Sequence, residues 1–167
     1  MAAFYLGEQM GADGIETDIQ RTRDGMLVLQ HDASLKRTTG LDCSVSELSW
    51  AEISRLDAGA WKGSQFTGER MVRLEDLLYF FGGKPIHFAL EIKQAGIELD
   101  VVEVASRYLQ PEQFTVTSFQ LDSLLVLAEH CPKVRLGYLT KDFSIELIEY
   151  LHAQGIDEYC PNAQGLE

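Results

Sequence analysis

GADGIETDIQRTRDGMLVLQHDASLKRTTG, residues 11–40, contains two apolar runs of β-strand character joined by a tight turn at Asp24-Gly25. Side chains two residues apart in a strand point to the same face, so Glu16 and Asp18 should present two carboxylates side by side. The turn folds the second run back along the first. We therefore expect His31, at the end of that second run, to lie near both carboxylates.

A further pair of charged residues, Glu91 and Lys93, stands far downstream at the end of the apolar run 86–93. The same alternation places both side chains on one face of a strand. An unpaired carboxylate inside an apolar run is costly, so a cation or Lys93 must offset the charge of Glu91. Three acids near a histidine indicate a site for a hard cation, and carboxylate oxygens suit Mg²⁺ or Ca²⁺.

Plainer explanations are open for each of these residues. Glu16 and Asp18 could cap a solvent-facing strand end, and Lys93 could serve only as an ion-pair partner. Ser118 and Phe119 end a later apolar run, where they could line the same pocket. Alternatively, they are a capping serine and a core phenylalanine.

Strand-like and helix-like patterns alternate along most of the chain, which predicts an α/β fold with a parallel sheet and its helices outside. A more polar segment, 33–72, interrupts this alternation and carries one expected helix, Ser46 to Arg55. The strand-like runs are 14–20, 26–31, 86–93, 114–118, 134–139 and 156–160, and the helical patterns are 5–10, 97–109, 120–130 and 143–153.

Composition excludes two classes of partner. The chain has 26 acidic residues against 14 Lys and Arg, and its net charge of −12 would repel nucleic acid. No run approaches the roughly 18 consecutive apolar residues of a membrane span. The cysteines fit neither a zinc pattern nor a disulfide framework, so we expect free thiols in a reducing compartment, the cytoplasm; they are Cys43, Cys131 and Cys160.

Residues 11–40, together with shorter matches at 56–59, 74–77, 91–93 and 118–119, resemble the glycerophosphodiester phosphodiesterase family of phospholipase-C-like TIM barrels. The resemblance implies a (β/α)8-type barrel. With 167 residues and six strand-like runs, the chain is shorter than the roughly 250 residues typical of this fold. We therefore expect a single partial barrel domain, 1–167, without its first and last strands and with 33–72 as an insertion over the barrel mouth.

The resemblance also implies an activity and a set of roles. The family hydrolyses glycerophosphodiesters, small molecules that yield glycerol 3-phosphate and an alcohol, with one divalent cation, Mg²⁺ or Ca²⁺. Glu16, Asp18 and Glu91 would hold that cation, and Lys93 would bind a phosphate oxygen. His31 would be the general acid or base, since an imidazole gives or takes a proton near neutral pH.

The chain departs from the family before its first helix-like pattern. The family has a His-Arg-Gly motif and then a Glu-Asn-Thr motif there, and we interpret Met1 as an internal methionine taken as the start. An alternative is a truncated or degenerate barrel that is inactive and self-associates through exposed edges. A metabolite-binding α/β domain without hydrolysis is a third hypothesis.

Overall fold

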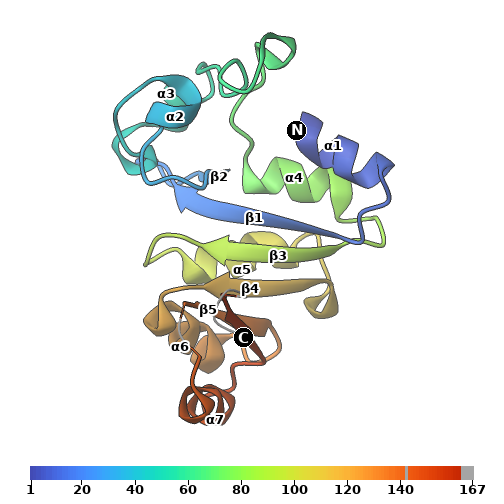
Figure 1. The fold of residues 1–167 in the computed structure, drawn as a ribbon, viewed down its shortest axis with the longest axis vertical. Coiled ribbons are helices and arrows are strands. Elements are labelled where there is room, and N and C mark those ends of the chain that lie inside the picture. Colours follow the sequence, from blue (N-terminus) through green and yellow to red (C-terminus); the bar gives the residue numbers. More distant parts are fainter. Residues whose placement is uncertain (142, 163–167) are drawn as a thin grey trace.

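The computed structural model of the chain describes residues 1–141 and 143–162 (Figure 1). The α/β class expected from the sequence is confirmed. None of the helices in these ranges is both long and apolar enough to span a membrane. In chain order the elements are α1 (Ala2–Gln9), β1 (Gly14–Arg21), β2 (Leu27–Leu29), α2 (Lys36–Thr39), η1 (Val45–Glu47), α3 (Trp50–Ile53), η2 (Ser64–Phe66), α4 (Leu74–Phe81), β3 (His87–Ile92), α5 (Glu98–Ser106), η3 (Pro111–Gln113), β4 (Phe114–Ser118), α6 (Leu121–His130), β5 (Arg135–Thr140), α7 (Ile145–Ala153) and β6 (Glu158–Pro161), where η denotes a 3₁₀-helix.

The described strands form one sheet in the order β2-β1-β3-β4-β5-β6. All neighbouring pairs are parallel except β1 and β2, which pair antiparallel, with Ile19 opposite Leu29. The hairpin predicted from Asp24-Gly25 is therefore present, and Gly25 has the positive φ, 90°, that favours glycine. Since β2 is a hairpin arm, the described residues supply five of the eight parallel strands of a complete barrel.

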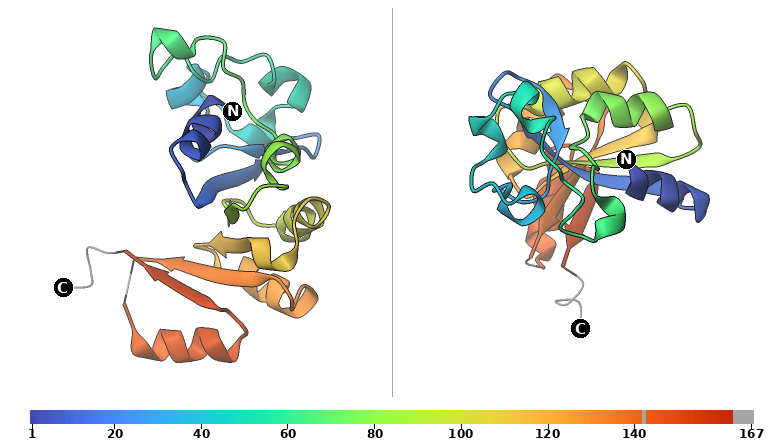
Figure 2. Two further views of the ribbon diagram at one scale, coloured as in Figure 1. Left: turned by 90° about the vertical axis from the view of Figure 1, so that its right-hand side faces the viewer. Right: turned by 90° about the horizontal axis from the view of Figure 1, so that it is seen from above.

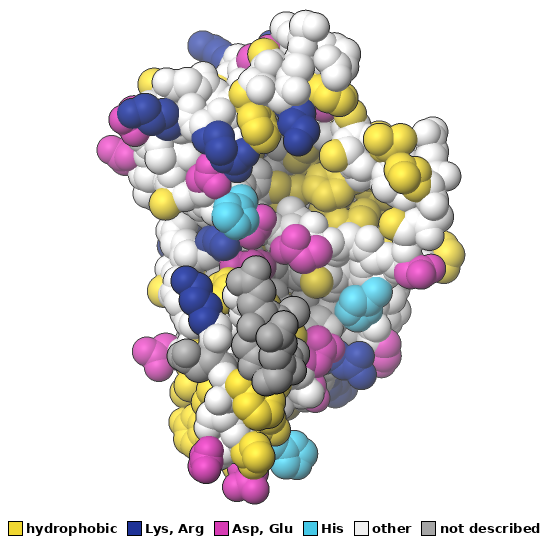
Figure 3. Space-filling view, in the orientation of Figure 1, with side chains coloured by type: hydrophobic (Ala, Val, Ile, Leu, Met, Phe, Trp, Pro, Cys, Tyr) yellow, Lys and Arg dark blue, Asp and Glu magenta, His cyan; other side chains and the backbone are white. Residues whose placement is uncertain are grey.

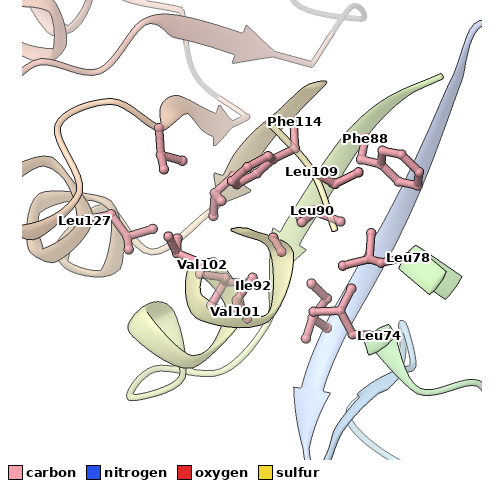
Figure 4. Close-up of a cluster of buried hydrophobic side chains, with 14 of the residues drawn as sticks. Leu74, Leu78, Phe88, Leu90, Ile92, Val101, Val102, Leu109, Phe114 and Leu127 are labelled. Atoms are coloured by element: carbon pink, nitrogen blue, oxygen red, sulfur yellow. The ribbon is translucent and has the colours of Figure 1, made fainter. Parts of the chain in front are cut away.

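The two faces of the sheet differ in polarity. On one face Phe88, Leu90 and Phe114 are buried, and they belong to a core that includes Val101 of α5 and Leu127 of α6 (Figure 4). Helices α4, α5 and α6 lie along this side of the sheet (Figure 2). The alternate residues of the same strands face away from the helices, on the side that forms the interior of a barrel. The charged residues singled out in the sequence lie on that second face.

The segment 33–72 has a small core of its own near the carboxyl end of β1, where Figure 1 places α2 and α3. This core joins the segment to the hairpin arm β2, and its buried members are Val28, Leu35, Val45, Ile53 and Met71. The alternation of strands and helices resumes after this segment, beginning with α4, a helix not predicted from the sequence. The segment is therefore a compact structure anchored on β2.

The prediction of a single helix over Ser46–Arg55 is wrong. The structure has the 3₁₀-helix η1 and the one-turn helix α3, separated by extended backbone. Each begins with a capping box, Ser44 with Glu47 and then Ser49 with Glu52. Two successive capping boxes start two separate turns, so the second interrupts any helix that the first could begin.

Truncating Leu90 should show how strongly the helix-covered face stabilises the sheet. Leu90 is fully buried, and Leu90→Ala should lower the free energy of unfolding by about 2–5 kcal/mol. Leu99→Ala makes the same change on α5 at a side chain that is 47% exposed, and it should change this free energy by less than about 1 kcal/mol. Urea unfolding followed by circular dichroism measures both. Equal effects would contradict the assignment of this face as the core.

Candidate functional site

Strand register brings two distant carboxylates together. In the parallel pairing of β1 with β3, Asp18 stands directly opposite Glu91. Glu16 lies two residues before Asp18 on the same strand, so its side chain is on the same face. Adjacent strands are only about 4.8 Å apart, and the register alone therefore groups the three acids.

The acidic cluster, defined as Glu16, Asp18 and Glu91, can offer oxygen atoms that all lie within 4.8 Å of one another. Glu91 is buried, Asp18 is half-buried and Glu16 is exposed. Partial burial, followed by the charges of Asp18 and Glu91, raises the pKa of Glu16. Three converging carboxylates with a carboxyl that resists ionisation are the arrangement that a hard divalent cation stabilises.

Lys93 supplies the positive charge that this cluster needs. Its Nζ atom lies 2.8 Å from Oε1 of Glu91 and 3.4 Å from Oδ1 of Asp18. Burial lowers the pKa of Lys93, but the hydrogen bonds and charges of Glu91 and Asp18 outweigh it and raise that pKa overall. Lys93 is therefore a firmly protonated ammonium beside the acids, able to bind an anion or to pair with them.

His31 follows the hairpin arm β2 and lies at the rim of the cluster. The backbone N–H of Gln30 donates to the carbonyl of Asp18 at 2.9 Å, which ties the end of this arm to β1. The charge of His31 acts on Glu16 and lowers the pKa of that carboxyl slightly against the larger raising effects. The structure thus brings all five of the residues singled out in the sequence to one end of the sheet.

The two residues after β4 have different surroundings. Ser118 is fully buried, and its hydroxyl donates to the carbonyl of Ile92 at 2.9 Å and accepts from the N–H of Gln120 at 3.0 Å. It therefore serves the backbone. Phe119 is 50% exposed, and its ring lies 5.9 Å from Nζ of Lys93, so it borders the charged site.

Two groups at the site, Gln20 and Arg37, were given no role from the sequence. Gln20, a buried residue of β1, donates from its side-chain amide to the carbonyls of Gln30 and Asp32 at 2.8 and 2.9 Å. Arg37 makes two hydrogen bonds to the carboxylate of Asp32. A polar residue at a buried strand position is the signal that could have drawn attention to Gln20.

The surface around the site is hollowed. Figure 3 shows acidic, basic and histidine side chains near the middle of one face, beside an apolar hollow. A groove of about 400 Å³ lies between α1 and the segment 57–70, and Leu6, Trp61 and Phe66 contribute to its wall. Charged and apolar surfaces therefore occur together on this part of the molecule.

Comparison with known proteins identifies relatives over most of the chain. Residues 1–159 match the model of the "Glycerophosphoryl diester phosphodiesterase family". The glycerophosphodiester phosphodiesterase of Caldanaerobacter subterraneus subsp. tengcongensis is 34% identical over 157 residues, which are 91% of this chain and 63% of that protein. A glycerophosphodiester phosphodiesterase of Bacillus altitudinis is 30% identical over 171 residues, covering 99% of this chain and 70% of that protein.

A solved structure gives the same result for the fold. A phosphodiesterase of Oleispira antarctica, in complex with the product sn-glycerol-3-phosphate, superposes with a TM-score of 0.87 at 26% identity, covering 96% of this chain and 67% of that one. The incomplete barrel expected from the sequence is confirmed, and the chain spans about two thirds of these relatives. The described residues supply five parallel barrel strands and not six, because the strand-like run 26–31 forms the antiparallel hairpin arm β2. Sequence and fold agree, and the chain belongs to the glycerophosphoryl diester phosphodiesterase family.

Proposed function

We propose that the chain is a metal-dependent phosphodiester hydrolase that cleaves glycerophosphodiesters into glycerol 3-phosphate and an alcohol. The observation that carries this proposal is the juxtaposition of the acidic cluster, the protonated Lys93 and His31 at one end of the sheet. The product bound to the Oleispira antarctica relative, sn-glycerol-3-phosphate, supports the same substrate class. The chain is strongly acidic, so it can accept a small, negatively charged diester where the charge of its own carboxylates is neutralised locally.

The acidic cluster fits one Mg²⁺ or Ca²⁺ ion in its donor chemistry. Glu16, Asp18 and Glu91 would hold the ion through carboxylate oxygens, the ligands that both cations prefer. Such a cation, when bound, neutralises charge that develops on a phosphoryl oxygen. With the cluster neutralised in this way, Lys93 no longer has to offset Glu91 and can bind a second phosphate oxygen.

His31 is proposed to move the proton. Phosphodiester hydrolysis requires a proton on the departing alcohol oxygen and removal of one from the attacking water. The ring is 66% exposed and free of the sheet, so it can reach a diester held above the cluster. Residues 33–72 are proposed as the cover of the barrel mouth on that side, because this segment packs on the hairpin arm β2, which His31 follows.

An inactive or assembly-dependent barrel is the alternative. It would associate with a second copy through the strand edges at the borders of the sheet, where backbone groups can pair with another chain. Both proposals are compatible with a cytoplasmic location, which the three free cysteines support.

Glu91→Gln should abolish tight binding of the divalent cation, because it removes a buried charged ligand while keeping the shape of the side chain. We expect the affinity for Mg²⁺ or Ca²⁺ to fall by about a hundredfold or more. Loss of a residue that only supports a metal ligand already costs about 10–100-fold, and Glu91 is a proposed ligand itself. Titration calorimetry measures it. Glu129→Gln, at an exposed position of α6, is the matched control and should bind as the unchanged chain does. Intact binding in Glu91→Gln would contradict the proposed ligand set.

His31→Ala should lower the rate of glycerophosphocholine hydrolysis by about 10²–10⁴-fold, the usual contribution of a general acid or base, and leave cation affinity unchanged. Release of glycerol 3-phosphate measures the rate. His130→Ala removes an exposed histidine of α6 and should have no effect. A folded, cation-binding chain without any hydrolysis would favour the inactive alternative instead.

Glu16→Gln should stabilise the cation-free chain at neutral pH. The pKa of Glu16 is raised in the folded protein. Above that raised pKa, the ionised carboxylate lowers the free energy of unfolding. This destabilisation disappears as the pH falls below the ordinary value of 4.5, where Glu16 is protonated in both the folded and the unfolded state. Thermal unfolding at several pH values should show Glu16→Gln more stable than the unchanged chain at pH about 7 and equal to it at pH about 4. Saturating Mg²⁺ or Ca²⁺ should reverse the order at neutral pH, since the variant binds the ion less well.

A further inference from the structure

A continuous series of contacts leads from His31 into the segment 33–72. Nδ1 of His31 lies 2.9 Å from Oδ1 of Asp32. The same carboxylate accepts hydrogen bonds from Nε and Nη2 of Arg37 at 2.6 and 3.0 Å. The guanidinium of Arg37 in turn lies 4.6 Å from the centre of the Trp61 ring. Three side chains, that of the neighbouring Asp32 and those of Arg37 and Trp61 from the segment 33–72, are therefore arranged in order behind the imidazole.

The backbone at His31 and Asp32 is already held from the other side. The buried amide of Gln20 donates to the carbonyls of Gln30 and Asp32, and the amide of Gln30 adds a bond to the carbonyl of Asp32 at 3.3 Å. These bonds fix the backbone on either side of His31 but leave the torsions of its side chain free. Because the ring is 66% exposed, packing does not orient it, and that task falls to its contact with Asp32.

Trp61 is itself fixed in place. Its indole N–H donates to the carbonyl of Ala58 at 3.0 Å. The turn below it is built on Asp57, whose carboxylate accepts from the backbone N–H groups of Gly59, Ala60 and Gly68. A Cβ atom at Gly59 would lie 2.1 Å from the carbonyl oxygen of Phe66, so only glycine fits there. The ring that stacks on Arg37 therefore stands on a rigid turn.

The Arg37 pair is more than an ordinary surface ion pair. Lys36, one residue earlier on α2, forms such a pair with Asp42 at 2.7 Å, with both side chains about two thirds exposed. By contrast, Arg37 makes a two-point contact with Asp32, whose side chain is 28% exposed. The hydrogen bonds from Arg37 and then His31 lower the pKa of Asp32 to about 2. Asp32 is therefore ionised at any working pH and only accepts, so Nδ1 of His31 must carry the proton.

We infer that Arg37, stacked on Trp61, is a positioning residue that holds Asp32 as a fixed acceptor for Nδ1–H of His31 and so leaves Nε2 as the atom that exchanges protons with substrate. This inference rests on the proposed role of His31 in hydrolysis. A neutral imidazole offers either nitrogen, and the nitrogen left free is set by the hydrogen bond that the other makes. The insertion thereby acts on the reaction through the side-chain geometry behind His31.

The tautomer of His31 tests the inference independently of activity. In ¹⁵N NMR spectra of the full chain, recorded at a pH about two units above the ordinary imidazole pKa, the ring nitrogens of His31 should have the well-separated shifts of a single Nδ1–H tautomer. Arg37→Ala and Asp32→Asn should move these shifts toward the average of two exchanging tautomers. Arg37→Lys keeps the charge but not the two-point contact, and it should also lose the single tautomer. Lys36→Ala, the matched control, should leave the spectrum unchanged.

Activity provides the second measurement. Arg37→Ala should reduce kcat by about tenfold or more with little change in KM, as expected when a partner that orients a reacting group is lost. Trp61→Ala should produce a smaller reduction, and Lys36→Ala none. Unchanged ¹⁵N shifts of His31 in Arg37→Ala would overturn the inference. Loss of the single tautomer in that variant, in a chain that hydrolyses no diester even when unchanged, would support the inference about position and overturn the proposed function instead.

Discussion

The site depends on the register of one strand pair. Because β1 and β3 run parallel with Asp18 opposite Glu91, two carboxylates from distant parts of the chain are forced to within a strand spacing of each other. A shift of one residue would turn every charged side chain of one strand into the helix-covered core. The buried leucines and phenylalanines on the opposite face therefore fix the position of the acids as firmly as they stabilise the sheet.

This register creates an electrostatic problem that the chain solves with one residue. Glu91 is buried next to another carboxylate, and the ammonium of Lys93 lies within 2.8 Å of it. The sequence left open whether Lys93 binds phosphate or only pairs with Glu91. The structure shows the ion pair with Glu91. Under the proposed function, the same ammonium becomes free to meet an anion when another cation neutralises the acids.

Local pattern predicted the parts of the fold that depend on local chemistry. The alternation in β1 and β3 and the turn at Asp24-Gly25 were sufficient to group the acids and His31, because period and turn type are properties of neighbouring residues. The helix α4, Leu74–Phe81, was not predicted as a helix, although its buried residues recur with helical spacing. The segment 33–72 was misread as containing one longer helix because its two capping boxes are only five residues apart.

What the sequence could not predict is how Gln20, Arg37 and Trp61 support the histidine. The contacts of Gln20, Arg37 and Trp61 depend on the tertiary arrangement of the hairpin and the insertion, and no period or spacing encodes them. This division has a physical reason. Under the proposed function, cation ligands need a fixed spacing, which strands provide through backbone register, whereas a group that transfers protons must reach a substrate and is best placed on an exposed turn. An exposed ring has no packing to orient it, so its orientation must come from hydrogen bonds to residues that are themselves held elsewhere in the fold.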